Sequence, residues 1–268
     1  MTLRSGEVSI SEPNGNFVIP ESFSFFGLSV SFYGLCLVLA ALIGIVVISH
    51  LSKKKNLNEE RNLTLITVTI VSALVGARIY YAIFEWQIFV EEPLTLLNLR
   101  SGGFSYFGAV LGAWSAVKFY CKRKNADFNQ SADTLSIGAA AAAPVVWLGC
   151  AFSREPLGRL YDGLFAVSVG KEYMYPVAAY GIVLSILSFV VLCVCLYQRK
   201  QQGTAFTLYL ILNAVMCLIL EFFRADRSCI WGTEIPVNYV VAGVLLAVIL
   251  YGRIRELYLE KKRKRIFL

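Results

Sequence analysis

The stretch Gly138–Arg159, GAAAAAPVVWLGCAFSREPLGR, decides the fold. It opens with small residues, which let transmembrane helices approach one another closely. Pro144 removes a backbone donor partway along, which kinks or breaks a helix. Arg154, Glu155 and Arg159 follow, next to a second proline and a glycine. A small-residue helix that runs into such a turn is typical of a membrane span at the bilayer edge, where arginines are either headgroup anchors or parts of a site.

The composition indicates a polytopic membrane protein. Of the 268 residues, 57% are hydrophobic and 16% are charged, and the mean hydropathy is +0.63. The net charge of +7 sits in short basic runs between apolar segments, a membrane-protein pattern, so we expect no nucleic-acid partner. The seven cysteines form no CxxC pair and His50 is the only histidine, so we expect neither a metal site nor a cofactor.

Seven apolar runs predict an all-α protein with seven transmembrane helices in a single domain, residues 1–268. Each run approaches the roughly 20 residues that cross a bilayer. The third is the weakest, because Lys118 and several glycines dilute it. Residues 1–25 form a polar outer segment without the pattern of a cleavable signal peptide, and residues 253–268 form a basic tail. The runs are about 28–50, 63–84, 104–121, 133–152, 176–197, 205–223 and 236–252.

The positive charges predict the orientation of the chain. The connections after the first, third and fifth runs, together with the tail, hold sixteen lysines and arginines. The opposite side holds seven: Arg4, Arg100, Arg154, Arg159, Lys171, Arg224 and Arg227. Because positive charge accumulates on the cytoplasmic side, the N-terminus should be outside and the C-terminus in the cytoplasm.

Arginines on the translocated side run against this rule and need a reason. Arg154 and Arg159 follow the fourth run, and Arg224 with Arg227 follow the sixth. Guanidinium groups offer planar bidentate donors to phosphate oxygens, so a cluster at the outer face suits a phosphate ligand. Glu221 and Arg224 are three residues apart and therefore share a helix face.

Arg78 lies inside the second apolar run, in LVGARIYYAIF. A charge at membrane depth indicates a functional residue, and the alternative is a structural ion pair with Glu221 or Glu85. We expect Arg78 to be buried and paired with a carboxylate.

The stretch SGGFSYFGAVLG at 101–112 is rich in glycine, which lets a backbone approach another backbone or a ligand. Helix packing is the simpler interpretation, although glycine-rich turns that open a helix also bind anions. The sequence contains no P-loop lysine and no GxGxxG, so nucleotide binding has no support.

Six motifs, in order over about residues 25–252, resemble the bacterial prolipoprotein diacylglyceryl transferases. FYGLCLVLA looks like the first-helix pattern of that family, and LVGARIYYAIF like its Gly-Ala-Arg segment. SGGFSYFGAVLG, GCAFSREPLGR, YPVAAY and LEFFRAD follow, the last similar to a Glu-Phe-x-Arg-x-Asp segment with a proposed catalytic arginine. The residues at the matching positions are Tyr33, Arg78, Gly102, Gly103, Gly108, Cys150, Gly158, Arg159, Tyr175, Glu221 and Arg224, and Arg154 lies within the matching loop.

The chain also departs from the family pattern. Phe107 stands where the family has His or Tyr, and Trp147 replaces the arginine that usually opens the signature loop. Cys150 holds the Asn or Cys position, and Tyr175 stands in for the His of His-Pro.

The resemblance implies seven transmembrane helices around a lipid-accessible central cavity, in the bacterial inner or plasma membrane. It implies transfer of a diacylglyceryl group from phosphatidylglycerol to the lipobox cysteine of a prolipoprotein, the first step of lipoprotein maturation. The partners would be phosphatidylglycerol and prolipoprotein signal peptides. Arg224 is the catalytic arginine that the resemblance implies. Because the displacement needs a thiolate, Tyr106, Tyr175 and Glu221 are candidate proton acceptors. The implied substrate-binding residues are Tyr33, Arg78, Gly102, Gly103, Gly108, Cys150, Arg154, Gly158 and Arg159.

Other functions stay open or are disfavoured by the residues. Because Phe107 and Trp147 remove polar groups, a non-catalytic or altered-substrate relative that binds anionic lipid or lipopeptide is the alternative. Residues 236–252 contain no lysine for a retinal Schiff base, and no paired halves of a transporter are visible.

Overall fold

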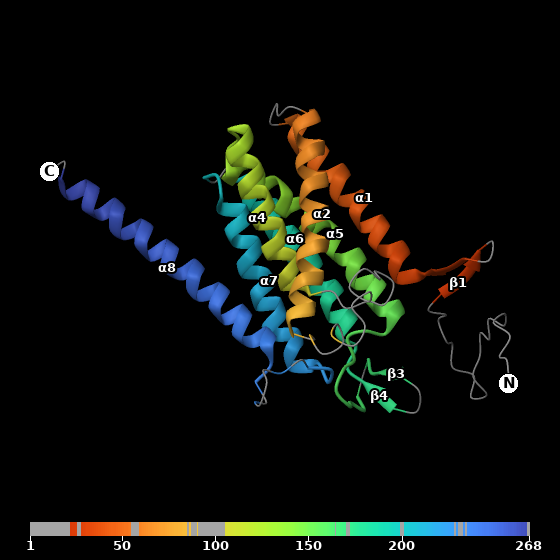
Figure 1. Cartoon of the computed structure of the whole chain (residues 1–268). Coiled ribbons are helices and arrows are strands. Elements are labelled where there is room, and N and C mark those ends of the chain that lie inside the picture. Colours follow the sequence, from red (N-terminus) through yellow and green to blue (C-terminus); the bar gives the residue numbers. More distant parts are fainter. Residues whose placement is uncertain are drawn as a thin grey trace. The chain divides into compact units, whose positions relative to one another are not determined.

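The computed structural model describes residues 22–25, 28–54, 59–84, 86, 90, 105–163, 165–169, 172–198, 201–227, 229, 233 and 235–266. Over these residues the chain forms seven long helices and two short antiparallel hairpins (Figure 1). The helices are α1 (Phe32–Lys54), α2 (Glu59–Phe84), α4 (Tyr106–Lys124), α5 (Phe128–Ser153), α6 (Val177–Tyr197), α7 (Thr204–Phe223) and α8 (Val237–Ile266). Strand β1 (Ser22–Phe25) pairs with β2 (Leu28–Ser31), and β3 (Val167–Val169) pairs with β4 (Glu172–Met174).

The helices confirm the predicted all-α polytopic membrane protein. Each of the seven apolar runs corresponds to one helix. By length and composition, α1, α2, α5, α6 and α7 are able to cross a membrane, and α8 contributes a shorter apolar part over Val237–Gly252. The third run, which Lys118 and several glycines dilute, corresponds to α4. This helix is not among those apolar enough to cross a membrane. The basic tail continues α8 as helix as far as Ile266.

Two local expectations need correction. The first apolar run was expected to be helical from about residue 28, but residues 28–31 are strand β2 and the helix begins at Phe32. The hydroxyl of Ser31 accepts a hydrogen bond from the Gly34 amide at 3.1 Å, so this serine caps the helix and fixes its start. Pro144 does not break α5, which runs unbroken from Phe128 to Ser153.

The chain divides into two compact units, each described by itself. The first comprises residues 1–44, 139–192 and 210–268, and the second comprises residues 45–138 and 193–209. The expected single domain over 1–268, with its polar segment 1–25 and its tail 253–268, stays a prediction, as does the central cavity.

In the second unit, α2 and α4 pack against one another through glycines. A Cβ atom on Gly76 would lie 2.5 Å from the carbonyl oxygen of Gly108, and one on Gly112 would collide with the carbonyl oxygen of Ser72. Only hydrogen in place of a side chain permits this approach. Gly108 and Gly112 therefore have the packing role that the glycine-rich sequence left open.

A buried carboxylate fixes the start of α7 in the same unit. Asp133 of α5 is 7% exposed, and its two oxygens accept from the backbone amides of Gly203 and Phe206, each at 2.7 Å. These amides belong to the first turn of α7, whose donors have no partner within the helix. Asp133 thus supplies the cap and a favourable charge from a helix about 70 residues away in sequence.

Candidate active site at the end of α7

Arg224 is the first residue after α7. Among the described arginines of the first unit, its guanidinium makes the most hydrogen bonds. Its Nε lies 3.1 Å from Oδ1 of Asp226, and its Nη2 donates to the Asp226 carbonyl oxygen at 3.2 Å. Its Nη1 lies 3.5 Å from Oε2 of Glu221. The side chain is still 26% exposed. Two carboxylates therefore orient a cation that keeps access to its surroundings.

Glu221 is buried beneath Arg224, with 1% of its surface exposed. Its Oε2 accepts from the Asn238 amide of α8 at 2.8 Å as well as from Arg224. Its Oε1 has no hydrogen-bond partner among the described residues. A buried acceptor of this kind is costly, so it favours a donor that arrives from outside the described structure.

Arg227 caps the C-terminus of α7. Its Nη2 donates to the carbonyl oxygens of Glu221 at 2.6 Å and Phe222 at 3.1 Å, and its Nε donates to that of Arg224 at 3.1 Å. Helix C-terminal carbonyls otherwise lack partners, and a cation there also complements the helix dipole. The sequence grouped Arg227 with the phosphate-facing arginines, but its donors are engaged by the helix end.

The segment from Leu157 to Tyr161 lies extended between the end of α7 and the start of α6. On one side, Arg159 N donates to the Phe223 carbonyl at 2.9 Å and Ala225 N donates to Leu157 at 2.9 Å. On the other side, Tyr175 N donates to Arg159 at 3.0 Å and Tyr161 N to Tyr173 at 2.9 Å. These hydrogen bonds join Leu157–Tyr161, the end of the stretch quoted first, to residues 223–227 around Arg224, which we call the Arg224 turn.

Gly158 is the one residue in this segment that could not carry a side chain. A Cβ atom there would collide with the carbonyl oxygen of Tyr175. Arg159 follows it, with Nε donating to the Arg224 carbonyl at 3.3 Å and its guanidinium 5.5 Å from the Phe222 ring. Arg159 and Arg224 are therefore in direct contact, although 65 residues separate them in sequence.

Arg154 ends α5 in an unusual backbone conformation. Its φ of 55° is left-handed, and Glu155 N donates to the Cys150 carbonyl at 3.2 Å. This is the closing bond of a Schellman motif, in which glycine is the usual residue at the left-handed position. An arginine there costs backbone energy that a glycine would not.

Tyr33 and Cys150 lie at the α1–α5 contact of the first unit. A Cβ on Gly149 would lie 2.9 Å from the Cβ of Cys36 and 3.2 Å from Cδ2 of Tyr33, so the two helices touch at this glycine. The contact places the Tyr33 side chain beside the residue that precedes Cys150.

Tyr175 lies in an aromatic cluster beside the same turn. Its ring stacks on that of Tyr161 with centroids 4.0 Å apart and planes at 14°, and it lies 5.2 Å from the Phe223 ring. Tyr180 contacts the other side of Phe223 at 5.2 Å. The cluster supports the extended segment of Leu157–Tyr161.

Eight of the predicted site residues therefore gather in one unit, from four stretches that are distant in sequence. A family model described as "Prolipoprotein diacylglyceryl transferase" matches residues 20–254 of the chain. The chain belongs to the prolipoprotein diacylglyceryl transferase family. The gathered residues are Tyr33, Cys150, Arg154, Gly158, Arg159, Tyr175, Glu221 and Arg224.

Curated relatives are similar over most of their length. The phosphatidylglycerol–prolipoprotein diacylglyceryl transferase of Finegoldia magna is 26% identical over 232 residues, which is 85% of this chain and 94% of that protein. The protein of the same name in Clostridioides difficile is 26% identical over 243 residues, covering 91% and 96%. That of Clostridium tetani is 29% identical over 219 residues, covering 77% and 86%.

The departure at Trp147 has a packing explanation in this member of the transferase family. A Cβ on Gly181 of α6 would collide with the indole ring, so the ring lies directly on the α6 backbone. The tryptophan fills the α5–α6 contact where the family pattern has an arginine. The other departure, Phe107, is buried in α4 at 6% exposure.

The remaining predicted residues lie in the second unit or outside the described residues. Arg78 is 5% exposed, which confirms its burial, and its pairing with Glu221 or Glu85 stays a prediction. The Tyr106 side chain is hydrogen-bonded to that of Tyr209. Gly102, Gly103 and Glu85 lie outside the described residues.

Sequence reasoning missed two residues that position the site. Asn238 holds Glu221, and the signal for it was a polar residue near the start of the last apolar run. Glu155 donates its backbone amide to the Cys150 carbonyl and lies in the quoted loop, yet it received no role. Among the described residues, no group of three or more His, Cys, Asp or Glu side chains is arranged to hold a metal ion.

Proposed function

We propose that this chain transfers the diacylglyceryl group of phosphatidylglycerol to the lipobox cysteine of a prolipoprotein, the first step of bacterial lipoprotein maturation. The observation that carries the proposal is the Arg224 guanidinium, oriented by Glu221 and Asp226 and still partly exposed. Membership of the family and the names of the relatives supply the reaction.

In this reaction, the cysteine sulfur forms a bond to the glyceryl carbon that bears the phosphate ester. The carbon–oxygen bond to phosphate breaks, and glycerol phosphate leaves. The thiol proton passes to a base, because the thiolate is the effective nucleophile. Arg224 is placed to donate to the phosphate, where negative charge develops as the bond breaks. Arg159 and Arg154 are proposed to bind the same headgroup.

Three residues are candidates for the base. Glu221 is favoured by its unpartnered Oε1, although its other oxygen is engaged by Arg224 and Asn238. Tyr175 is held in a ring stack, and Tyr106 is bonded to Tyr209. Tyr33, Cys150 and Gly158 are proposed as substrate-binding residues at the edge of the Arg224 turn. Arg78, Gly102, Gly103 and Gly108 enter the proposal through the family resemblance alone.

The proposed setting is the bacterial inner or plasma membrane, with the N-terminus outside and the C-terminus in the cytoplasm. Five helices able to cross a membrane and the bacterial relatives support a multi-pass membrane protein. The sixteen-to-seven charge asymmetry supports the orientation. Phosphatidylglycerol and the signal peptides of prolipoproteins would enter sideways, through a lipid-accessible central cavity.

One observation favours a second candidate, a non-catalytic relative that binds anionic lipid or lipopeptide. Trp147 packs on α6 and Phe107 is buried, so neither position offers a polar group to a substrate. Such a protein would bind an anion at the Arg224 turn but would not catalyse diacylglyceryl transfer.

The test uses the purified full-length protein in vesicles that contain phosphatidylglycerol, with a peptide that carries a lipobox cysteine. Mass spectrometry should find the peptide heavier by one diacylglyceryl group, and the same peptide with serine for cysteine should stay unmodified. A known transferase is assayed in parallel. Binding of the peptide without any mass gain, while the known enzyme works, would favour the second candidate.

A further inference from the structure

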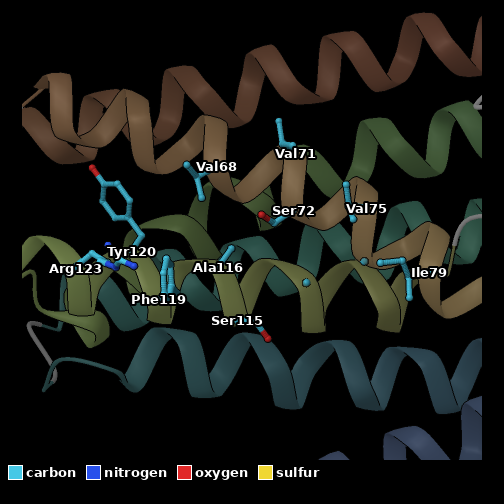
Figure 2. A pocket seen from close by; sticks show the side chains of 12 residues that line it. Val68, Val71, Ser72, Val75, Ile79, Ser115, Ala116, Phe119, Tyr120 and Arg123 are labelled. Carbon is cyan, nitrogen blue, oxygen red and sulfur yellow. The ribbon is translucent and has the colours of Figure 1, made fainter. Parts of the chain in front are cut away.

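A groove runs along α2 and α4, wholly within the second unit. Its volume is about 640 Å³, within the range of small-molecule sites, roughly 300–1,000 Å³. Val68, Val71 and Val75 of α2 and Ala116 and Phe119 of α4 are among the residues that line it (Figure 2). Tyr120 and Arg123 lie at one end of the groove and Ile79 lies at the other (Figure 2). The groove is apolar along its length and positively charged at one end.

The glycine contact between the helices forms the floor of the groove. Gly76 and Gly112 are both part of its lining, and at each of them a Cβ atom would collide with the backbone of the opposite helix. Larger apolar residues form the walls and are themselves uncovered: Val71 is 54% exposed, Val75 53% and Phe119 61%. Since α2 is able to cross a membrane, these walls would face lipid chains.

The charged end is built around Arg123. Its guanidinium lies 4.9 Å from the ring of Phe119, a groove wall, so it is held over the opening. The Tyr120 hydroxyl donates to the Arg61 carbonyl at 3.1 Å, which ties this end of α4 to α2. Lys122 and Lys124 flank Arg123 in the last turn of α4. No carboxylate of the described residues forms a salt bridge with Arg123.

The groove is long enough to hold an acyl chain. Val68 and Ile79 are eleven residues apart on α2, which at about 1.5 Å per residue is roughly 16 Å. The hydrocarbon core of a bilayer is about 30 Å thick, so this part of the groove alone is about as long as one leaflet is deep. The charged end lies beyond Val68, because Tyr120 is bonded to Arg61. An acyl chain lying in the groove would start beside Arg123 and extend along α2 toward Ile79.

We propose that this groove binds one acyl chain of an anionic phospholipid, with its phosphate at Arg123. In the proposed orientation this is the cytoplasmic leaflet. The acyl chain lies against the valines of α2 and Phe119, and the phosphate supplies Arg123 with the anionic partner that no carboxylate of the described residues provides. A second copy of the chain is a poorer occupant. Copies in one membrane share an orientation, so the three basic residues at this end would meet their own like charges.

Photo-crosslinking in vesicles tests the proposal without any turnover. The full-length protein is reconstituted with phosphatidylglycerol that carries a diazirine in one acyl chain, or with phosphatidylcholine that carries the same chain. Peptide mass spectrometry then locates the labels. We expect stronger labelling of residues 68–79 and 112–123 by phosphatidylglycerol. Arg123→Gln should lower it by about tenfold, the effect of losing a charge-assisted hydrogen bond to the phosphate.

Matched variants separate the groove from its surroundings. Lys122→Gln removes a neighbouring charge outside the lining and should leave the labelling unchanged. Ala116→Phe fills the groove and should reduce labelling by both lipids, whereas Leu111→Phe places the same side chain at an exposed position of α4 outside the lining and should not. Labels elsewhere in the protein serve as the internal standard for folding.

Three results would overturn the proposal. Equal labelling by the two lipids in the wild type would show that the phosphate has no site there. An equal loss in Arg123→Gln and Lys122→Gln would mean diffuse surface attraction. Crosslinks between two chains at α2 and α4 would show that a second copy covers the groove. Because transfer to a peptide is measured separately, these results bear on the groove alone.

Discussion

At the scale of single residues, Arg224 is the side chain whose surroundings say most about chemistry. If its guanidinium stabilises the departing phosphate, Arg224→Ala should lower the rate of diacylglyceryl transfer by about 10²–10³. Arg224→Lys should recover little, because an ammonium supplies charge without the planar fork that engages Asp226 and Glu221 together. The measurement is transfer to the lipobox peptide in vesicles. A variant with alanine that works at the wild-type rate would remove Arg224 from the mechanism.

A substitution of Arg154 can separate the role of its backbone in ending α5 from the role of its guanidinium in transfer. Its φ of 55° suits glycine, so Arg154→Gly should change the free energy of unfolding by no more than about 1 kcal/mol, because relief of strain offsets added chain entropy. If the guanidinium binds the headgroup, the same variant should nevertheless lose transfer activity. Unfolding in detergent and transfer are measured on the same preparation. Unchanged transfer in a stable Arg154→Gly protein would assign the residue to helix termination only.

The pairing of Glu221 with Arg224 could be predicted, because residues three apart on a helix share a face. The contacts of Asn238 with Glu221 and of Arg159 with the Arg224 carbonyl could not. They join residues 17 and 65 positions apart, and nothing local in the sequence specifies such distances. The capping role of Arg227 was missed for a related reason, since a charge beyond a helix end is equally compatible with a headgroup or with the helix's own carbonyls.

At the scale of elements, the start of α7 depends on a residue of α5. Asp133→Ala leaves the amides of Gly203 and Phe206 without their acceptors, so it should cost about 1–2 kcal/mol of unfolding free energy. Asp133→Asn keeps one acceptor oxygen and should cost less. Denaturant titration in detergent micelles checks both. Equal stability of the alanine variant and the wild type would mean that water or the preceding turn caps the helix instead.

The positions of the helices follow from the sequence, because each apolar run carries its own length and polarity. The small strands do not follow as readily. Strands β3 and β4 are three residues each, and β4 also forms a bridge from Met174 to the distant Leu160. The predicted start of α1 at about residue 28 was wrong for a similar reason. The apolar run includes residues 28–31, but Ser31 caps the helix, which therefore begins at Phe32.

At the scale of the whole molecule, the prediction concerns which side of the membrane each end occupies. Cys229 follows α7 on the side proposed to be outside and is exposed, so the native chain already carries a probe. A membrane-impermeant maleimide should label Cys229 in intact cells. In a Cys229→Ser background, a cysteine introduced as Lys262→Cys should react only after permeabilisation, because the positively charged tail is retained on the cytoplasmic side. Labelling of both positions in intact cells, or of neither, would contradict the orientation. It would also place the lipid groove and the Arg224 turn in leaflets other than those proposed, while leaving the contacts within each unit as they are.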